Sequence, residues 1–400
     1  INLVNTEIVK GGFLFALKEG VFIENKQLRL LYRKPATSFN EKAVQQYQAN
    51  RLSVIEEVVY EEDDRIDLVI FINGLALFAI ELKFNPNGQS VQDAIKQLKG
   101  RNSKNRLFRF EQGVLASFAV DTLEVYMTTQ LKGQETYFLP FNMGKGEGIE
   151  TGSGNPHNPN GVDTEYLWLD VLTMDSILQL VESFIFYEVD KTNSKKKTLI
   201  FPRYHQRRAV SRLLEDMKTN HTDNNYLIQH SAGSGKTNTI AWLAHSLVSL
   251  HDDQNRNIVD TVLIVTDRIV VDRQLQDAVR QINHKNGVVK VMGDRETSSD
   301  LADAIAGNTK IIATTIHKFA QINQSDWMSV GNTANKKFAI LIDEAHSSTT
   351  GSYMSSVSQV LTETDTEGRT IDEVQEVTVA DAIEQEIART GKQDNVSIIA

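Results

Sequence analysis

Apolar and polar positions alternate in two different ways along the chain, and the change comes near residue 190. In the first half, short strand-like runs flank one stretch with helical spacing, residues 90–100, whose apolar positions share a face. A stretch rich in Gly, Asn and Pro, residues 131–165, predicts a long loop, and a helix is expected over residues 171–186. The strand-like runs are residues 28–32, 54–60, 66–72, 75–83, 113–120 and 124–129. We therefore expect one α/β domain over residues 1–189.

The second half alternates buried apolar strands with amphipathic helices. A polar, charged segment, residues 190–199, separates the two halves and is expected to be a linker. Alternating buried strands and helices are typical of a parallel sheet that is covered by helices on both faces. The apolar strand runs are residues 226–228, 261–266, 311–315, 338–342 and 396–400. The pattern predicts a doubly wound domain over residues 200–400.

The amino-acid composition indicates where the protein is located but says little about its activity. The chain contains no cysteine and no apolar run long enough to span a bilayer. We therefore expect no disulfide, no thiolate metal site and no membrane partner, and a cytoplasmic location fits. The formal net charge is −10, whereas proteins that bind nucleic acid through bulk charge are basic. Any contact with DNA must therefore use local groups of side chains.

A loop of small residues, 230–235, joins a strand run to an apolar-periodic helix that begins at Lys236. A strand, a glycine-rich loop, and a lysine and a hydroxyl at a helix N-terminus together form a cradle for phosphate. Lys236 would contact the β- and γ-phosphate oxygens of ATP, and Thr237 would bind Mg²⁺. The alternative is an ordinary glycine turn. The candidate ATP-binding residues of this segment are Gly233, Ser234, Gly235, Lys236 and Thr237.

The strand run at residues 338–342 ends in two acidic residues, Asp343 and Glu344. Ligands bind at the carboxyl ends of the strands in doubly wound sheets, so this pair is expected beside the phosphate loop. Asp343 would hold Mg²⁺, and Glu344 would orient and deprotonate the water that attacks ATP. His346 would bind at the same ATP site and couple hydrolysis to motion. An acidic pair at a strand end can be structural, but the preceding phosphate loop favours ATP hydrolysis.

Charged residues interrupt two apolar strands on either side of Asn73-Gly74, a dipeptide typical of a β-hairpin turn. Asp67 lies on the first strand, and Glu81 and Lys83 share one face of the second. Charges on a covered sheet face are costly unless they bind a metal or another charge. Two carboxylates that hold Mg²⁺ and a lysine that activates water would form a catalytic site for cutting a phosphodiester.

The register of the hairpin tests this hypothesis. An uninterrupted ladder with a two-residue turn pairs Asp67 with Ile80, and that pairing puts Glu81 on the opposite face. The site therefore requires a shift of one residue, which we predict as a β-bulge between the turn and Glu81. The alternative is that these charges lie on an edge strand and discourage aggregation.

The aspartate and the Glu-x-Lys sequence of this hairpin resemble the PD-(D/E)xK nuclease superfamily, although Ile66 replaces the proline that gives the superfamily its name. Members of that superfamily often have a Gln-x-x-x-Tyr motif on the next helix. Gln97 matches its first position, so the resemblance implies a catalytic role for Gln97. Arg101 stands in place of the tyrosine, and we expect it to contact DNA.

The second half resembles the superfamily two helicases. Gln206, about 30 residues ahead of the phosphate loop, matches the adenine-binding glutamine of these motors. The ends of the strand runs at residues 261–266 and 311–315 resemble motifs that hold a DNA backbone. Ordinary helix starts and loops are the alternative for both features. The candidate DNA contacts are Thr266, Arg268, Thr315 and His317.

A PD-(D/E)xK domain directly ahead of a superfamily two motor resembles the restriction (R) subunit of type I restriction-modification enzymes. The matching segments are residues 71–83, 138–142, 200–206, 226–237 and 266–268. The resemblance implies a restriction-endonuclease-like α/β domain followed by the first RecA-like motor domain. It also implies a subunit that joins methyltransferase (M) and specificity (S) subunits, moves double-stranded DNA with ATP and Mg²⁺, and cuts that DNA away from the recognition site.

Two other functions stay open from the sequence. One is a stand-alone nuclease-helicase of DNA repair or phage defence, and the other is a translocase or docking module that does not cut DNA. The second motor domain and its arginine finger would follow Ala400, and an N-terminal nuclease helix is expected to lie outside the sequence. We therefore expect these 400 residues to bind nucleotide weakly and to hydrolyse it poorly.

Overall fold

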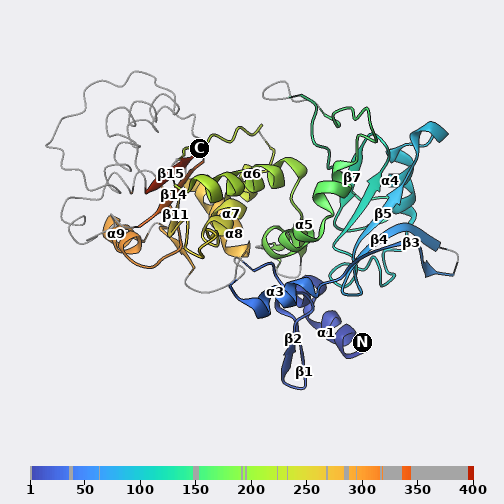
Figure 1. Cartoon of the computed structure of the whole chain (residues 1–400), viewed down its shortest axis with the longest axis horizontal. Coiled ribbons are helices and arrows are strands. Elements are labelled where there is room, and N and C mark those ends of the chain that lie inside the picture. Colours follow the sequence, from blue (N-terminus) through green and yellow to red (C-terminus); the bar gives the residue numbers. More distant parts are fainter. Residues whose placement is uncertain are drawn as a thin grey trace. The chain divides into compact units, whose positions relative to one another are not determined.

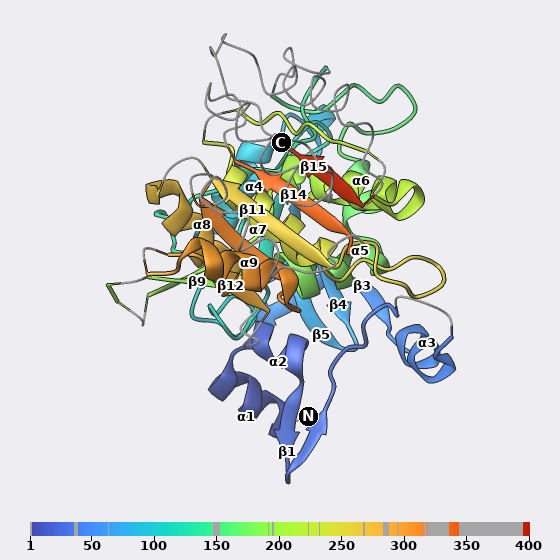
Figure 2. The same cartoon turned by 90° about the vertical axis from the view of Figure 1, so that its left-hand side faces the viewer.

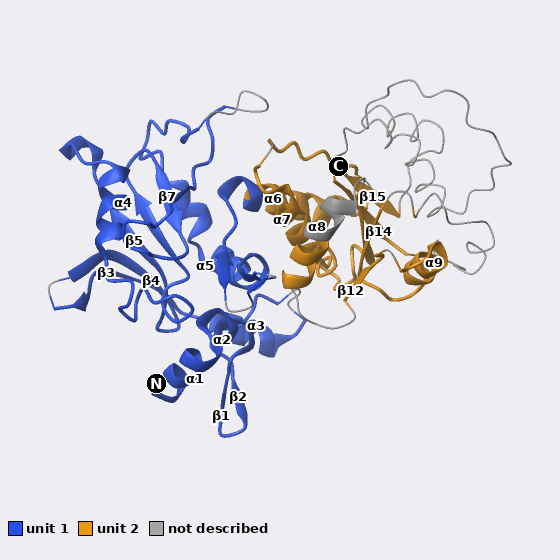
Figure 3. Ribbon diagram, turned by 180° about the vertical axis from the view of Figure 1, so that it is seen from behind, with its two compact units in different colours: residues 1–207 blue, residues 208–400 orange. Residues whose placement is uncertain are grey.

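The computed structural model divides the chain into two compact units, unit 1 (residues 1–207) and unit 2 (residues 208–400), shown in Figure 3. No helix in the described part of the chain is long and apolar enough to cross a membrane. The structure describes residues 2–35, 39–62, 64–146, 153–190, 192–193, 196–222, 224–231, 233–266, 269–282, 288–293, 295–315, 318, 336–343 and 395–400.

Unit 1 begins with two short helices and a small hairpin. Glu24 and Asn25 at the hairpin turn have positive φ, and the second strand pairs with a first strand of three residues and ends at Leu28. The strand predicted over residues 28–32 is therefore wrong, and the first two helices occupy a region where the pattern predicted no element. The elements are α1 (Asn2–Gly11), α2 (Phe13–Glu19), β1 (Val21–Ile23), β2 (Lys26–Leu28) and α3 (Glu41–Gln48).

A six-stranded sheet forms the centre of unit 1 (Figure 1). Its strands lie in chain order from β3 to β8; β5 and β6 are parallel, and the other neighbours are antiparallel. Helix α4 connects the parallel pair, and its residues Val91, Ala94 and Leu98 pack on Ala79 and Ala119 of the sheet. The predicted helix and its buried face are thus confirmed. The elements are β3 (Leu52–Glu61), β4 (Asp64–Ile72), β5 (Leu75–Leu82), α4 (Val91–Gly100), β6 (Ala116–Val120), β7 (Val125–Thr128) and β8 (Leu139–Pro140).

The helix predicted over residues 171–186 is interrupted in the structure. Thr173 and Ile185 have extended backbones and bound its regular part. The apolar residues that follow pair as a strand with residues from the predicted linker, so residues 190–199 contribute a strand to unit 1. The elements are α5 (Met174–Gln179), a π-helical turn (Leu180–Phe184), β9 (Phe186–Val189) and β10 (Lys197–Ile200).

An aromatic cluster attaches the residues after β10 to the core of unit 1. Phe201 is 7% exposed, and its ring lies edge-on to the rings of Phe78, Phe118 and Phe141 at centroid distances of 6.0 Å. Edge-to-face pairs at this distance are favourable. The compact unit therefore extends to Arg207, beyond the domain boundary that we predicted.

Unit 2 is built on a five-stranded parallel sheet (Figure 2). Its strand order is β12-β13-β11-β14-β15, and Tyr226 and Ile228 donate backbone hydrogen bonds to the carbonyls of Ile398 and Ala400 at the β15 edge. The predicted parallel sheet and its last strand are confirmed. The strands are β11 (Thr261–Thr266), β12 (Val289–Val291), β13 (Ile311–Thr315), β14 (Phe338–Ile342) and β15 (Val396–Ile399).

Helices cover both faces of this sheet, as predicted. Leu301 and Ile305 of α9 pack on Leu263, Ile312 and Ile340, which share one face. Helices α7 and α8 contact each other and the sheet, and they lie on the other side of the strands from α9 (Figure 1). The helices are α6 (Tyr204–Asn220), which begins in unit 1, α7 (Lys236–Leu247), α8 (Ile269–Ile282) and α9 (Ser298–Ala306).

Replacing Phe201 by alanine should destabilise unit 1 and leave unit 2 unchanged. Truncation of a buried phenylalanine removes its packing and leaves a cavity, at a cost of about 3–5 kcal/mol. Hydrogen exchange of the β6 amides in the full chain should accelerate, whereas exchange of the β11 amides should not. Phe39→Ala is the control, because that side chain is 73% exposed. Faster exchange in β11 alone would mean that Phe201 stabilises unit 2 instead.

Candidate active sites

The hairpin of β4 and β5 contains the predicted turn and the predicted bulge. Both residues of the turn have positive φ, as a tight two-residue hairpin turn requires. Phe71 pairs with Ala76, but the preceding residue, Ile70, pairs with Phe78. Leu77 is therefore an extra residue in β5, and the predicted one-residue shift is confirmed.

The bulge puts Asp67 and Glu81 on the same face of the sheet. Beyond it the pairing is shifted by one residue, so Asp67 stands opposite Glu81 and not opposite Ile80. The carbonyl of Leu77 accepts a hydrogen bond of 2.8 Å from the backbone N–H of Leu115, immediately before β6. The extra residue is thus tied to the neighbouring strand, and this bond helps to hold the register.

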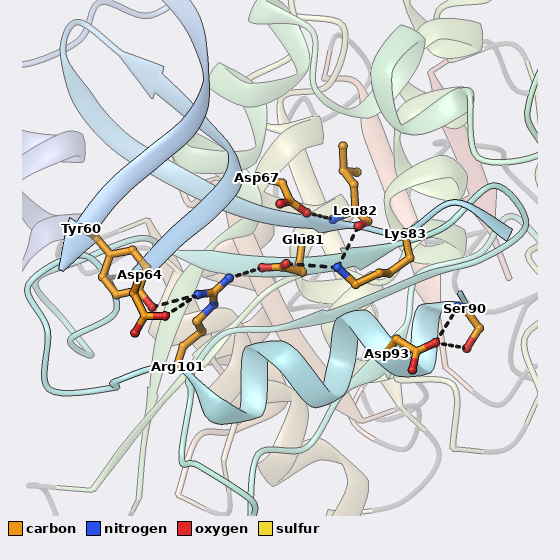
Figure 4. Close-up of polar contacts among 9 residues, drawn as sticks. All are labelled: Tyr60, Asp64, Asp67, Glu81, Leu82, Lys83, Ser90, Asp93 and Arg101. Carbon is orange, nitrogen blue, oxygen red and sulfur yellow. Dashed lines mark hydrogen bonds and ion pairs between the residues drawn. The ribbon is translucent and has the colours of Figure 1, made fainter. Parts of the chain in front are cut away.

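Asp67, Glu81 and Lys83 converge at the end of this hairpin (Figure 4). Oδ2 of Asp67 accepts a hydrogen bond of 2.7 Å from the backbone N–H of Leu82, across the two strands. Nζ of Lys83 donates to the Leu82 carbonyl at 3.1 Å and lies 3.4 Å from Oε1 of Glu81. The structure therefore brings the three predicted nuclease residues together.

The Glu81 carboxylate is fully buried between two cations. Besides Lys83, Arg101 contacts it: Nη2 of Arg101 donates to Oε2 at 2.9 Å. Burial raises the pKa of Glu81 above its usual range, and the nearby charge of Asp67 adds to this effect, although both cations oppose it. A carboxylate pair with one fully buried member would be stabilised by a divalent cation.

Arg101 is buried inside unit 1, so the prediction that it contacts DNA does not agree with the structure. Its side chain is 6% exposed, and its second terminal nitrogen, Nη1, donates to Asp64 at 3.0 Å and to the Tyr60 hydroxyl at 3.3 Å. The guanidinium also lies 5.7 Å from the centre of the Tyr60 ring. Both terminal nitrogens are therefore used inside the protein, where they cannot face a phosphate.

Tyr60 and Asp64 are site neighbours that the sequence did not reveal. Tyr60 lies next to the end of β3, and Asp64 closes an acidic run, residues 61–64, at the start of β4. Nothing in the pattern distinguishes Asp64 from the acidic residues beside it, because only the folded hairpin brings it to Arg101.

Gln97 lies on the exposed face of α4. In the described structure no hydrogen bond joins it to Asp67, Glu81 or Lys83. The structure therefore does not bring Gln97 together with the nuclease residues, and its catalytic role stays a prediction.

The oxygen atoms of this site fit Mg²⁺. Asp67 and Glu81 each use one carboxylate oxygen in a short hydrogen bond within the protein, and Oε1 of Glu81 has a longer contact of 3.4 Å with Nζ of Lys83. A cation would bind Oδ1 of Asp67 and share Oε1 of Glu81 with Lys83. Mg²⁺ prefers oxygen ligands and keeps several waters. No third Asp, Glu, His or Cys completes a metal-binding group among the described residues. Water, the Leu82 carbonyl and a substrate phosphate would therefore supply the remaining ligands.

The phosphate loop of unit 2 has the backbone that such a loop needs. Gly233 and Gly235 have φ values of 73° and 89°, in the left-handed region that favours glycine. Helix α7 begins directly after them at Lys236, with Thr237 in its first turn, and Ser234 between the glycines is buried. A Cβ added to Gly233 would meet no described atom within 4 Å, so the loop leaves room beside its backbone. This geometry fits a phosphate at the N-terminus of α7.

Asp343 lies at the carboxyl end of β14, and its backbone N–H donates to the Val265 carbonyl of β11 at 3.1 Å. Residues 226–228 and β14 run parallel with β15 between them, so the phosphate loop and Asp343 leave the sheet at the same edge. This placement fits a shared Mg²⁺ between Asp343 and Thr237. Glu344 and His346 lie outside the described residues.

The two threonines predicted to contact DNA are neighbours, but they are covered. Thr266 pairs with Thr315 at the ends of β11 and β13, with exposures of 1% and 7%. Neither offers an exposed side chain to a DNA backbone here, so this prediction is not supported. Arg268 and His317 lie outside the described residues.

Gln206 is buried near the start of α6. Its Oε1 accepts a hydrogen bond of 2.8 Å from the backbone N–H of Arg203. Next to it, Arg207 binds the Asp170 carboxylate with both terminal nitrogens, at 2.9 and 2.8 Å. This part of α6 is thus fixed within unit 1, and the adenine-binding role of Gln206 stays a prediction.

Comparison with known proteins finds relatives for both halves of the chain. Residues 15–136 match the family model of the type I restriction enzyme R protein N terminus, and residues 205–370 match that of the SWI2/SNF2 ATPase. An endonuclease subunit from Methanocaldococcus jannaschii, provisionally named as that of a type I restriction enzyme, is 26% identical over 89% of the chain. The chain is thus similar to R subunits of type I restriction enzymes that carry a helicase-like motor. A second relative, the endonuclease subunit of a Staphylococcus aureus type I restriction enzyme, is 26% identical over 76% of the chain.

These R-subunit relatives are named as endonuclease subunits, so the family is one of enzymes. The chain spans about a third of the length of the relatives, 34% and 30% for these two. Among solved structures, the UvsW protein of phage T4 is 13% identical over 57% of the chain and 34% of its own chain, with a TM-score of 0.32, too low for any conclusion.

The shifted register can be tested with pairs of engineered cysteines, since the chain has none of its own. Val69 pairs with Ala79 in the structure, whereas an uninterrupted ladder would pair it with Phe78. The Val69→Cys/Ala79→Cys variant should form a disulfide under mild oxidation, because directly opposed positions bring the sulfur atoms within bonding reach. The Val69→Cys/Phe78→Cys variant is the matched control and should stay reduced. Free-thiol counting by mass spectrometry measures both, and the reverse result would contradict the bulge.

Proposed function

We propose that this chain is the nuclease and first motor part of an R subunit that cuts double-stranded DNA and moves it with ATP. The observation that most strongly supports the nuclease is the bulge at Leu77. Without the extra residue, Asp67 and Glu81 would lie on opposite faces, and no single cation could contact both. A bulge that reverses the direction of a strand's side chains is common next to active sites.

Each residue of the nuclease site has a distinct task in this proposal. Asp67 and Glu81 would hold Mg²⁺, which supplies a water of lowered pKa and polarises the phosphate. Lys83 is restrained by the Leu82 carbonyl and by Glu81, so its ammonium group is directed at the same face. There it would orient the attacking water and offset negative charge as the phosphodiester is cut.

The motor site would bind ATP at the N-terminus of α7. The backbone of the glycine loop would surround the phosphates, Lys236 would contact the β- and γ-phosphate oxygens, and Thr237 and Asp343 would share Mg²⁺. The match to the SWI2/SNF2 ATPase model supports this assignment. As an R subunit, the protein would act on double-stranded DNA together with methyltransferase and specificity subunits, in the cytoplasm.

Asp67→Ala and Lys83→Ala should each abolish Mg²⁺-dependent cleavage of supercoiled plasmid by the chain assembled with its methyltransferase and specificity subunits. The first variant removes a metal ligand and the second removes the group that orients water. We expect at least a hundred-fold loss in rate for each, in line with the contribution of one positioned acid–base group, about 10²–10⁴-fold.

The matched control for these variants is Lys10→Ala, an exposed lysine that pairs with Glu7 on α1. Its cleavage rate should equal that of the wild type. If both site variants cut DNA at the wild-type rate, the nuclease assignment is wrong. If the wild type itself does not cut but moves DNA, the chain is a translocase that lacks nuclease activity.

Lys236→Ala should weaken ATP binding by roughly ten- to a hundred-fold, because a hydrogen bond to a charged group contributes about 1.5–3 kcal/mol. Titration of the chain with a fluorescent ATP analogue in Mg²⁺ measures the affinity. Lys218→Ala is the control, since Lys218 is exposed on α6 and forms a surface ion pair with Asp253. Equal affinity in the Lys236 variant and the wild type would rule out this loop as the phosphate site.

A further inference from the structure

Arg101 is the most deeply buried cation at the proposed nuclease site, and its burial does not fit the DNA contact that its place in the motif suggested. It lies at the C-terminal end of α4 and reaches across the sheet to Glu81. The loop after it is attached to the end of β3: Asn102 donates to the Glu61 carboxylate at 2.7 Å, and Asn105 donates to the Tyr60 carbonyl at 3.1 Å. The backbone around Arg101 is therefore fixed independently of its guanidinium.

The guanidinium itself is held on three sides. Asp64 accepts from Nη1, Glu81 accepts from Nη2, and the guanidinium lies over the ring of Tyr60. The Tyr60 ring is in turn packed edge-on against Phe108, with ring centroids 5.1 Å apart. Arg101 is thus a rigid donor, and the Glu81 oxygen that it binds is fixed with it.

Two effects of this contact on a bound cation oppose each other. The positive charge of Arg101 would repel Mg²⁺, but its hydrogen bond orients the Glu81 carboxylate. Asp64 reduces the repulsion, because its carboxylate lies 3.0 Å from Nη1 and offsets part of the charge of Arg101. With the charge of Arg101 partly offset by Asp64, we expect its effect on the orientation of Glu81 to be the larger one. Partners that orient a metal ligand typically change metal affinity or activity by 10–100-fold when they are removed.

We propose that Arg101 is a positioning residue of the nuclease site, which holds Oε2 of Glu81 so that Oε1 faces the cation shared with Asp67. This inference rests on the proposed nuclease function. It assigns Arg101 to the geometry of the metal ligands and not to the binding of DNA, and it gives Asp64 and Tyr60 the task of holding the guanidinium.

The test is a titration of the full chain with Mn²⁺, followed by electron paramagnetic resonance in the absence of nucleotide and DNA. The nuclease site is identified as the wild-type binding that disappears in Asp67→Asn. Arg101→Gln should weaken this binding by about ten-fold or more. Arg101→Lys should restore part of the affinity, because lysine keeps the charge but cannot bind Glu81 and Asp64 in the same planar arrangement.

DNA affinity is measured in parallel by fluorescence anisotropy in Ca²⁺, and we expect it to stay unchanged in Arg101→Gln. Arg207→Gln is the matched control, since Arg207 is equally buried at 6% side-chain exposure and also binds a carboxylate, Asp170, within unit 1. It should lower thermal stability in the same way without changing Mn²⁺ affinity. Asp64→Asn provides a milder variant, because the Asp64 side chain is 46% exposed. It should weaken Mn²⁺ binding in the same direction as Arg101→Gln.

Several results would overturn the inference. Tighter Mn²⁺ binding in Arg101→Gln would mean that Arg101 competes with the cation, and weaker DNA binding with unchanged Mn²⁺ affinity would make it a DNA contact. If Arg101→Gln does not fold, wild-type Mn²⁺ affinity in both Arg101→Lys and Asp64→Asn would overturn it, and weakened affinity would support it. Absence of any Mn²⁺ site sensitive to Asp67→Asn would instead defeat the proposed nuclease function, and this inference with it.

Discussion

One extra residue in β5 determines which face of the central sheet carries the proposed nuclease site. Side chains in a strand alternate with a period of two, so a shift of one residue moves Glu81 from one face to the other. Leu77 supplies that shift and is itself fully buried, and its carbonyl is bonded to the start of β6. The position of the two carboxylates is therefore a property of the sheet, and it does not depend on a loop that could take several conformations.

The same arrangement creates an electrostatic problem that the structure solves with cations. Two carboxylates face one another in a place where one of them has lost all contact with water, and burial raises the pKa of Glu81. Lys83 and Arg101 offset this cost within the protein. Arg101 binds one oxygen of Glu81 at 2.9 Å, whereas the contact of Lys83 with the other oxygen is longer, at 3.4 Å, and that oxygen is the one that a divalent ion would share. Positive charge beside the two carboxylates thus serves both the stability of the fold and the proposed reaction.

Local patterns predicted much of this structure because they depend on residues that are close in sequence. The Asn-Gly turn and the α4 spacing are of this kind, and the bulge followed from counting residues between the turn and Glu81. The failures depend on distant contacts. Lys197–Ile200 is polar at its start and belongs to unit 1 because it pairs with β9, and Phe201 belongs there because it packs among aromatic rings. The burial of Arg101 follows from its partners on β3 and β4, which no spacing along α4 reveals.

The central claim is that the carboxylates of Asp67 and Glu81 share a divalent cation. Crystals of the chain soaked in Mn²⁺ test it most directly, through an anomalous difference map at the manganese edge. The account predicts a peak within about 2.0–2.3 Å of one oxygen from each carboxylate, with water in the remaining positions. A map with no peak between these two side chains, from crystals in which Mn²⁺ is bound elsewhere on the chain, would contradict it.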